Sequence, residues 1–257
     1  LTGIENTAVG YVALEKNTGS YNTAVGSRAL DVNTTGTSNT ALGYQSLTSN
    51  TTADNNTALG YGAMAANSTG TQNTAVGSAA LDANTTANNN TALGFEALTA
   101  NTTGASNTAL GSQTLEANTD GNNNTAVGFL ALFANTSGST NTSVGENSSV
   151  TNTTGSDNTV VGSYAFYANT TGSDNCAFGA HALDANTDGS ENVAIGRHAL
   201  ADNTTGNSNV AIGHQALDDN TTASGNVAIG NHACMNNHNG SNLVAVGDQA
   251  LETLGTS

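Results

Sequence analysis

A glycine recurs every 17 residues along almost the whole chain. The series is strictly spaced from Gly26 to Gly247, and the interval from Gly10 to Gly26 is one residue shorter. Its members include Gly43, Gly60 and Gly77. The residues around each glycine follow one pattern, N-T-A-V-G-x-x-A-L-x-x-N-T-T-G-x-x. A fixed period of this length is typical of one short unit stacked on copies of itself.

The composition taken without the repeat would favour disorder. The chain has no proline, 30 glycines and only 9% charged residues, and Asn, Thr, Ala and Gly dominate it. Polar, low-complexity chains usually lack a packed core. A disordered spacer, however, has no reason to keep apolar residues in a strict register. We therefore expect an ordered fold.

The repeat unit predicts strands and turns. Seventeen residues are too few for a pair of helices, and the apolar residues fall into two short clusters, T-A-V and A-L, each bounded by Gly or Asn. Short apolar runs bounded by turn residues are typical of strands. We expect an all-β fold, a parallel β-solenoid of about 15 coils with two short strands in each coil. It would form one repeat domain over residues 1–257.

Alternation along the first strand assigns its side chains to two faces. The residue before each glycine is Val, Leu, Ile or Phe, the next one back is nearly always Ala, and the third is Thr or, later, Val. Because Thr exchanges with Val, we expect the first and third residues to point into the coil. Ala would then form an outer strip with Asn and Gly, suited to packing against identical chains. In the second strand, Leu47, Leu81 and Leu98 are expected core residues.

Two asparagine positions hardly vary. One series contains Asn33, Asn50 and Asn67, and the other contains Asn39, Asn56 and Asn73. Stacked amides can hydrogen-bond along the axis of a parallel sheet, and Asn also tolerates left-handed turn conformations. Both series are therefore predicted to be structural ladders.

The charge balance restricts the partners. Three Lys and Arg residues stand against nineteen Asp and Glu, a formal net charge of −16. Nucleic acids and anionic membrane surfaces are bound through clustered Lys and Arg, so neither is an expected partner. No stretch approaches the ~20 apolar residues of a membrane-spanning helix, so no membrane insertion is expected. The chain begins at Leu1 rather than Met, and we expect it to be a fragment or a processed chain.

Few residues offer metal or disulfide chemistry. Cys176 and Cys234 lie three coils apart, about 14 Å at the usual strand spacing, too far for a disulfide. Both are expected to be buried free thiols. His181, His198 and His232 share the position two residues after the glycine. His181 and His198 would lie one coil apart, close enough to bridge a metal ion, so these histidines are weak candidates for a metal site. The position varies between coils, which favours a surface role.

No catalytic constellation is present. The sequence lacks a Ser-His-Asp or Cys-His arrangement, a glycine-lysine phosphate loop and the calcium-binding nonapeptide pattern. The pair Asp218–Asp219 is at best a weak calcium candidate. We therefore expect no enzyme activity and no cofactor.

Two surface features carry alternative interpretations. Aromatic residues follow the glycine in several coils and could stack on sugars, although such residues more often cover the edge of a coil: Tyr11, Tyr44, Tyr61, Phe95 and Phe129. Many ladder asparagines also head N-x-S/T sequons, which a secretory pathway could glycosylate. These are Asn33, Asn50, Asn67, Asn84, Asn101, Asn135, Asn152, Asn169, Asn203 and Asn220.

The coil around residues 145–151 departs most from the pattern. Glu146, Asn147, Ser148, Ser149 and Val150 replace the usual aromatic, alanine and leucine positions. Because this coil lacks its core leucine, we expect a local weak point or kink there.

The motifs N-T-A-V-G-Y-x-A-L and N-V-A-I-G-x-x-A-L resemble the YadA-like (Hep/Hag) head repeats of trimeric autotransporter adhesins. The 17-residue version with its N-T-T-G segment is also similar to repeats of phage-type tail fibres. The resemblance covers residues 6–251. It implies a left-handed β-roll, three chains side by side, and an attachment role at a cell surface.

The expected function is that of a non-enzymatic extracellular fibre, as an adhesin head, a tail-fibre shaft or a surface filament. The expected partner is the chain itself, as a homotrimer or as an end-to-end filament, since neither end has a capping segment. A cell-surface or glycan receptor would be a second partner. An ice-binding solenoid that uses Thr or Asn/Ala rows is one alternative, and a glycan-binding rod is another.

Overall fold

The computed structural model of the chain describes residues 3–252, and it is an all-β solenoid. Fifteen strands of three residues each follow one another at intervals of 17 residues, except for a first interval of 16, and the described strand pairs are parallel. No described residue lies in a helix, so the described part contains no helix that could cross a membrane. The predicted parallel β-solenoid is confirmed.

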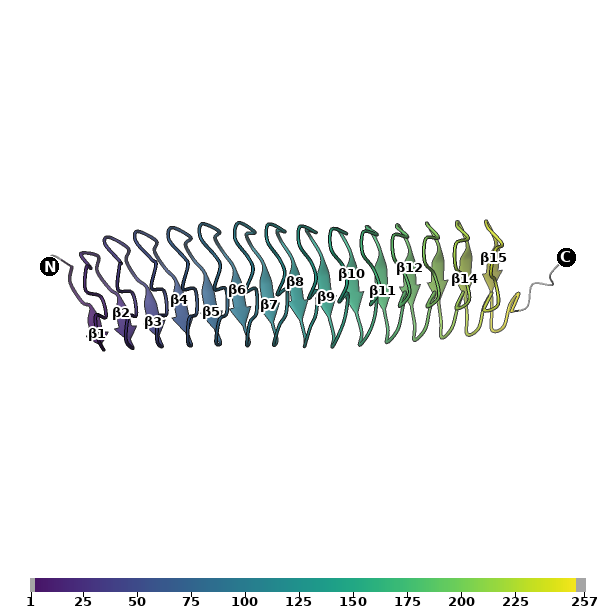
Figure 1. Cartoon of the computed structure of the whole chain (residues 1–257). Coiled ribbons are helices and arrows are strands. Elements are labelled where there is room, and N and C mark those ends of the chain that lie inside the picture. The colour runs from purple at the N-terminus through teal and green to yellow at the C-terminus, as the bar shows by residue number, and fades with distance from the viewer. Residues whose placement is uncertain (1–2, 253–257) are drawn as a thin grey trace. The chain divides into compact units, whose positions relative to one another are not determined.

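The chain consists of two compact units, residues 1–124 and 125–257. The first contains β1 (Thr7–Val9), β2 (Thr23–Val25), β3 (Thr40–Leu42), β4 (Thr57–Leu59), β5 (Thr74–Val76), β6 (Thr91–Leu93) and β7 (Thr108–Leu110). The second contains β8 (Thr125–Val127), β9 (Thr142–Val144), β10 (Thr159–Val161), β11 (Cys176–Phe178), β12 (Val193–Ile195), β13 (Val210–Ile212), β14 (Val227–Ile229) and β15 (Val244–Val246). Within each unit, consecutive strands pair with equivalent residues side by side, as in Thr57↔Thr74 and Val193↔Val210 (Figure 1).

Each coil has one strand rather than the predicted two. The A-L segment is a series of turns in which two residues adopt the left-handed conformation, as at Ala79 (φ 55°) and Leu81 (φ 54°). The amide of Leu81 still donates to the carbonyl oxygen of Ala97 in the next coil, at 2.9 Å. In an extended strand successive side chains alternate between faces. The left-handed residues break this alternation, so Ala80 and Leu81 are both fully buried.

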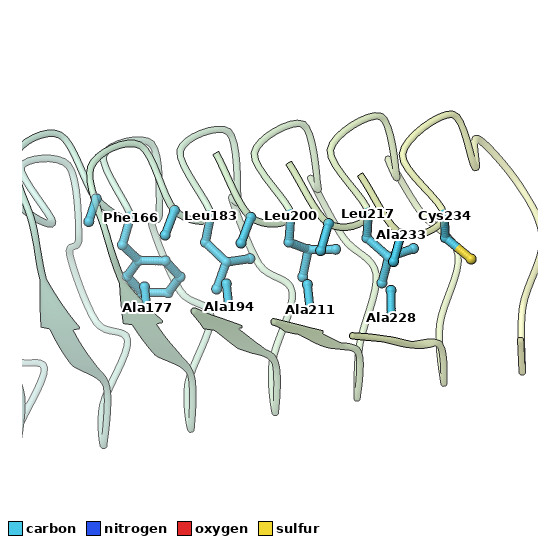
Figure 2. Packing of buried hydrophobic residues seen from close by; sticks show 14 of the residues in the cluster. Phe166, Ala177, Leu183, Ala194, Leu200, Ala211, Leu217, Ala228, Ala233 and Cys234 are labelled. Carbon is cyan, nitrogen blue, oxygen red and sulfur yellow. The ribbon is translucent and has the colours of Figure 1, made fainter. Parts of the chain in front are cut away.

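The predicted faces of the strand are inverted in the structure. Ala58 and Ala75, the middle residues of β4 and β5, are fully buried, whereas Thr57, Leu59 and Thr74 are exposed. Figure 2 shows the reason in the second unit, where leucines from the turn side project toward the strand alanines. Leu47, Leu81 and Leu98 are buried in the interior of their coils, as predicted. Each fills most of the space inside its coil, so that only alanine fits at the middle strand position opposite it.

The repeated glycine is required by its backbone conformation and by the neighbouring coil. Gly94 has φ 147°, and a Cβ atom there would collide with the carbonyl oxygen of Gly111. Such a conformation is essentially restricted to glycine. The second glycine of the repeat is less constrained, because Ala53 and Ala87 occupy the same position in other coils and are buried there.

The atypical coil of β9 keeps its place in the stack. β9 pairs in register with both β8 and β10. Its interior is polar, because Ser143 Oγ donates to Ser148 Oγ at 2.7 Å and also lies 3.2 Å from Ser149 Oγ. The next coil places the larger Val160 and Phe166 at the positions equivalent to Ser143 and Ser149, and all four are buried. The pairing register shows no break at this coil, and the predicted weakness of the coil stays a prediction.

Candidate functional surface

The first asparagine ladder lies inside the coils. Asn50 Nδ2 donates to Asn33 Oδ1 in the preceding coil at 2.8 Å and to the carbonyl oxygen of Ala53 at 3.1 Å. Asn67 donates in the same way to Asn50 Oδ1, at 3.1 Å. These three asparagines are fully buried, so the predicted ladder is confirmed. Because every amide nitrogen in it is enclosed, the folded chain does not present the sequon asparagines for glycosylation.

The second asparagine ladder is also internal. The amide N–H of Asn56 donates to Asn39 Oδ1 at 3.0 Å, and Asn56 Nδ2 donates to the carbonyl oxygen of Gly70 at 2.8 Å. Asn73 Nδ2 donates to Asn56 Oδ1 at 3.2 Å. This prediction is confirmed too, and the side chains of Asn56 and Asn73 join the strand side of their coils to the turn side of the next.

A third ladder was missed at the sequence level. The residue after the second glycine accepts, through its side-chain oxygen, the backbone N–H of the equivalent residue one coil earlier. Thr71 N donates to Asn88 Oδ1 at 2.6 Å, and Ser156 N donates to Ser173 Oγ at 3.0 Å. The signal was present in the sequence, since Thr, Asp, Asn or Ser occupies nearly every copy of this position.

The first and third residues of the strands form what we call the outer sheet face. In residues 1–124 the first residue is Thr in all seven strands, and the third is Val or Leu. Leu42 and Leu93 on this face are 44% and 41% exposed. In residues 125–257 the first column changes from Thr to Cys and then to Val. An extended apolar row on a flat sheet is the kind of surface that usually marks an interaction site.

The aromatic side chains extend this face along one edge. Tyr44 and Tyr61 stack on each other in neighbouring coils, with ring centroids 5.5 Å apart and planes at 16°. Tyr61 is 62% exposed and Tyr44 is 45% exposed. Each ring therefore has one face covered by its neighbour, and a sugar ring cannot stack on that face. This arrangement fits the edge-covering interpretation better than a sugar-stacking platform.

The histidine candidates form a partial stack. The rings of His181 and His198 are stacked with centroids 5.0 Å apart and planes at 6°, and Tyr164 stacks on the other face of His181. His181 Nδ1 lies 2.9 Å from Asp184 Oδ2. His232 is separated from this pair, and its Nε2 lies 3.0 Å from Gln215 Oε1.

This stacking does not suit a shared metal ion. The lone pairs of imidazole lie in the ring planes, so two parallel rings direct them side by side rather than toward one ion. Nowhere in residues 3–252 do three His, Cys, Asp or Glu side chains gather so that they could hold a metal. Burial lowers the pKa of His198, and the positive charge of Arg197 lowers it further, while Asp218 opposes both effects.

A shallow, open hollow of about 500 Å³ lies beside His198. Its lining residues are Tyr167, Ala168, Asp184, Ala185, His198, Ala201, Asp202, Gln215 and Asp218. Burial raises the pKa of Asp218, and the hydrogen bond from Gln215 Nε2, at 2.8 Å, lowers it in part. Asp184 and Asp218 are two coils apart, about 9.6 Å along the axis, too far for both to ligate one calcium ion at ~2.4 Å.

The two cysteines are free thiols, as predicted, but only one is fully buried. Cys234 occupies a core leucine position, whereas Cys176 lies on the outer sheet face and is half-buried. Burial raises the pKa of both thiols. The prediction that Cys176 is buried is wrong because it rested on the inverted strand faces.

Comparison with known proteins gives no information on the function of the chain. No protein-family model matches the sequence, and no curated protein matches it significantly.

Proposed function

We propose that the chain is a non-enzymatic structural and adhesive fibre element that acts outside the cell. The observation that carries this proposal is the repetition of both asparagine ladders from coil to coil. Asn84, for example, donates to Asn67 Oδ1 at 2.7 Å and in turn accepts from Asn101 Nδ2 at 3.2 Å. Each coil thus uses its buried polar groups to hold the next coil. The side chains that differ between coils lie mainly on the outside, where a fibre meets its partners.

The proposed partner is the chain itself, as a parallel homo-oligomer. The alanine strip expected to mediate this association is inside the coil, so the association would use the outer sheet face instead. Val, Leu and Ile side chains on that face offer apolar surface, whose removal from water favours association by roughly 25 cal/mol per Å². A net charge of −16 keeps separate particles apart and favours solubility. The resemblance to adhesin and tail-fibre repeats agrees with this assignment.

Light scattering coupled to size-exclusion chromatography tests the self-association. We expect a mass two or three times 25.4 kDa for the purified chain, the former for a face-to-face pair and the latter for a trimer. A monomer at every concentration up to the millimolar range would contradict the self-association. Attachment is tested by coating beads with the chain and measuring their retention on cell surfaces and on a glycan array. Retention no greater than with beads coated with an unrelated acidic protein would contradict the adhesive role.

Ice binding is a second candidate function, and the corrected strand faces favour it. Thr40, Thr57, Thr74, Thr91 and Thr108 form an exposed column in the first unit. Its members lie about 4.8 Å apart on a flat sheet. Thermal hysteresis of the purified chain tests this candidate. If the face binds ice, Thr74→Lys abolishes most of the activity, whereas Thr69→Lys on the exposed turn leaves it unchanged.

A further inference from the structure

The outer sheet face differs between the two units. In β1–β7 the first residue of every strand is Thr, so polar and apolar columns run side by side. In β12–β14 the first residue is Val and the third is Ile. We call the resulting set the aliphatic patch, and it consists of Val193, Ile195, Val210, Ile212, Val227 and Ile229. All six side chains are β-branched and none is fully buried.

The patch is partly exposed and regular. Ile195 and Ile229 are 40% and 37% exposed, and the neighbouring Phe178 on β11 is 43% exposed. Parallel pairing in register sets the rows about 4.8 Å apart. Exposed apolar surface of this kind is unfavourable in water, and it is typical of a site that another molecule covers.

The charges at the two edges of the patch are opposite in one coil. Glu191 lies two residues before β12, Arg197 lies two residues after it, and both are exposed. Arg197 is the only Lys or Arg in residues 125–257. The one Lys or Arg residue of this acidic unit therefore lies at the edge of the aliphatic patch.

We propose that the aliphatic patch docks against the same patch of a second copy of this chain, with the solenoid axes parallel and the coils at the same level. A rotation about an axis parallel to the solenoid exchanges the two edges of the face and keeps each coil at its level. Arg197 of one copy then lies opposite Glu191 of the other. In an antiparallel arrangement the same edges of the two faces would meet, and Arg197 of one copy would lie opposite Arg197 of the other. This inference rests on the proposed self-association and adds its surface, orientation and register.

The dimensions of the face fit a second copy. Eight strands at ~4.8 Å span about 34 Å, and the three extended residues of each strand span about 10 Å. The face therefore offers about 340 Å², less than half of the ~800 Å² that each partner contributes to a standard interface, which corresponds to a weak association. A second copy also presents rows with the identical spacing. Packed sheets lie about 10 Å apart, a gap that extended Arg and Glu side chains bridge at the rim.

Substitutions on the full-length chain test the surface. The triple variant Val193→Thr, Val210→Thr and Val227→Thr places at these positions the residue that the same column uses in β1–β10, so it is compatible with the fold. Val210→Asp is the stronger probe. Thr74→Asp introduces the same charge into the same column of the first unit and is the matched control. Sedimentation equilibrium gives the association constant, and circular dichroism verifies folding.

Both patch variants are expected to weaken association at least tenfold, whereas Thr74→Asp changes it less than threefold. Association of wild type that the patch variants leave unchanged overturns this inference alone. A wild type that stays monomeric overturns both the inference and the proposed self-association.

Charge exchange tests the orientation. Arg197→Glu and Glu191→Arg are each expected to weaken association several-fold, because each places like charges opposite one another. The double variant restores the opposite pairing in a parallel arrangement and is expected to recover association to within about twofold of wild type. A double variant as weak as the single variants overturns the parallel register.

Discussion

Asn84 Nδ2 donates a 2.7 Å hydrogen bond to Asn67 Oδ1 and a second bond, at 3.1 Å, to the carbonyl oxygen of Ala87. One side chain thus joins two coils and closes the turn of its own coil. The bond to a neighbouring copy recurs along the ladder, so the ladder behaves as a continuous internal strip of amides. Removing one member leaves buried groups unpaired on both sides of the gap.

Asn84→Ala is expected to destabilise the chain by about 2–4 kcal/mol, because the Asn67 oxygen and one N–H of the Asn101 amide lose a buried partner. The Ala87 carbonyl oxygen keeps the hydrogen bond from Asn73 Nδ2. Thr86→Ala, on the exposed turn two residues later, is the control and is expected to change stability by less than about 0.5 kcal/mol. Urea unfolding followed by circular dichroism measures both. Equal effects would show that the ladder contributes little.

Gly94→Ala is expected to cost more than about 3 kcal/mol, because it forces a side chain into a glycine-only conformation and against the carbonyl oxygen of Gly111. Gly104→Ala is the matched change at the second glycine. A Cβ atom there would also approach a backbone oxygen, that of Gly121, but φ lies outside the glycine-only range and Ala87 already occurs one coil earlier, so a smaller cost of about 1–2 kcal/mol is expected. The two midpoints in thermal unfolding should differ clearly. A mild effect at Gly94 would contradict the close approach of successive coils.

The serine-rich coil is expected to exchange its amide hydrogens faster than a regular coil. The amide of Ser149 donates to Ala165 O at 3.0 Å, and that of Leu183 donates to Ala199 O at the same distance, so the bonds themselves do not differ. Ser149, however, buries less apolar surface than Leu183, which lowers the local opening free energy. Native-state hydrogen exchange of the two amides compares them directly. Equal protection would mean that the serine hydrogen bonds and Phe166 compensate fully.

His198 gives a predicted dependence on pH. Its pKa is lowered in the folded chain, so the unfolded chain takes up the proton first as the solution is acidified. The folded state therefore loses stability as pH falls through about 6.5, the ordinary value for histidine. His198→Gln places there the residue found at the equivalent Gln215 and Gln249, and it should remove this loss. Melting temperatures of both chains between pH 8 and 5 test it, and parallel curves would count against it.

Prediction from sequence succeeded where a property repeats in every coil. The 17-residue spacing of Gly43, Gly60 and Gly77 is sufficient for a parallel solenoid, because only direct stacking brings identical residues together at each step. The asparagine ladders followed from the same reasoning, since an amide can pair with an identical amide above and below it. The third ladder escaped notice because its members vary among Thr, Asp, Asn and Ser, although all of them supply a side-chain oxygen.

The orientation of the strand could not be read from alternation alone. Alternation shows that Thr57 and Leu59 share one face and that Ala58 lies on the other, but it does not say which face is inside. The exchange of Thr for Val at the first position of the strand favoured the face of Thr57 and Leu59 as the inner one, and that choice was wrong. This wrong choice also affected the functional predictions. It led us to predict the alanines as the associating surface and to predict that Cys176 is buried.

The repeat by itself determined the stacking, the parallel pairing and the internal asparagine ladders, because these depend on relations between identical residues one period apart. The tertiary structure alone decided which side of each strand faces the core. Within a coil, the left-handed turn at Leu81 and its equivalents directs a large side chain inward, and in most coils the limited interior volume then admits alanine from the strand. That competition for space between two sides of one coil leaves Thr, Val and Ile on the surface.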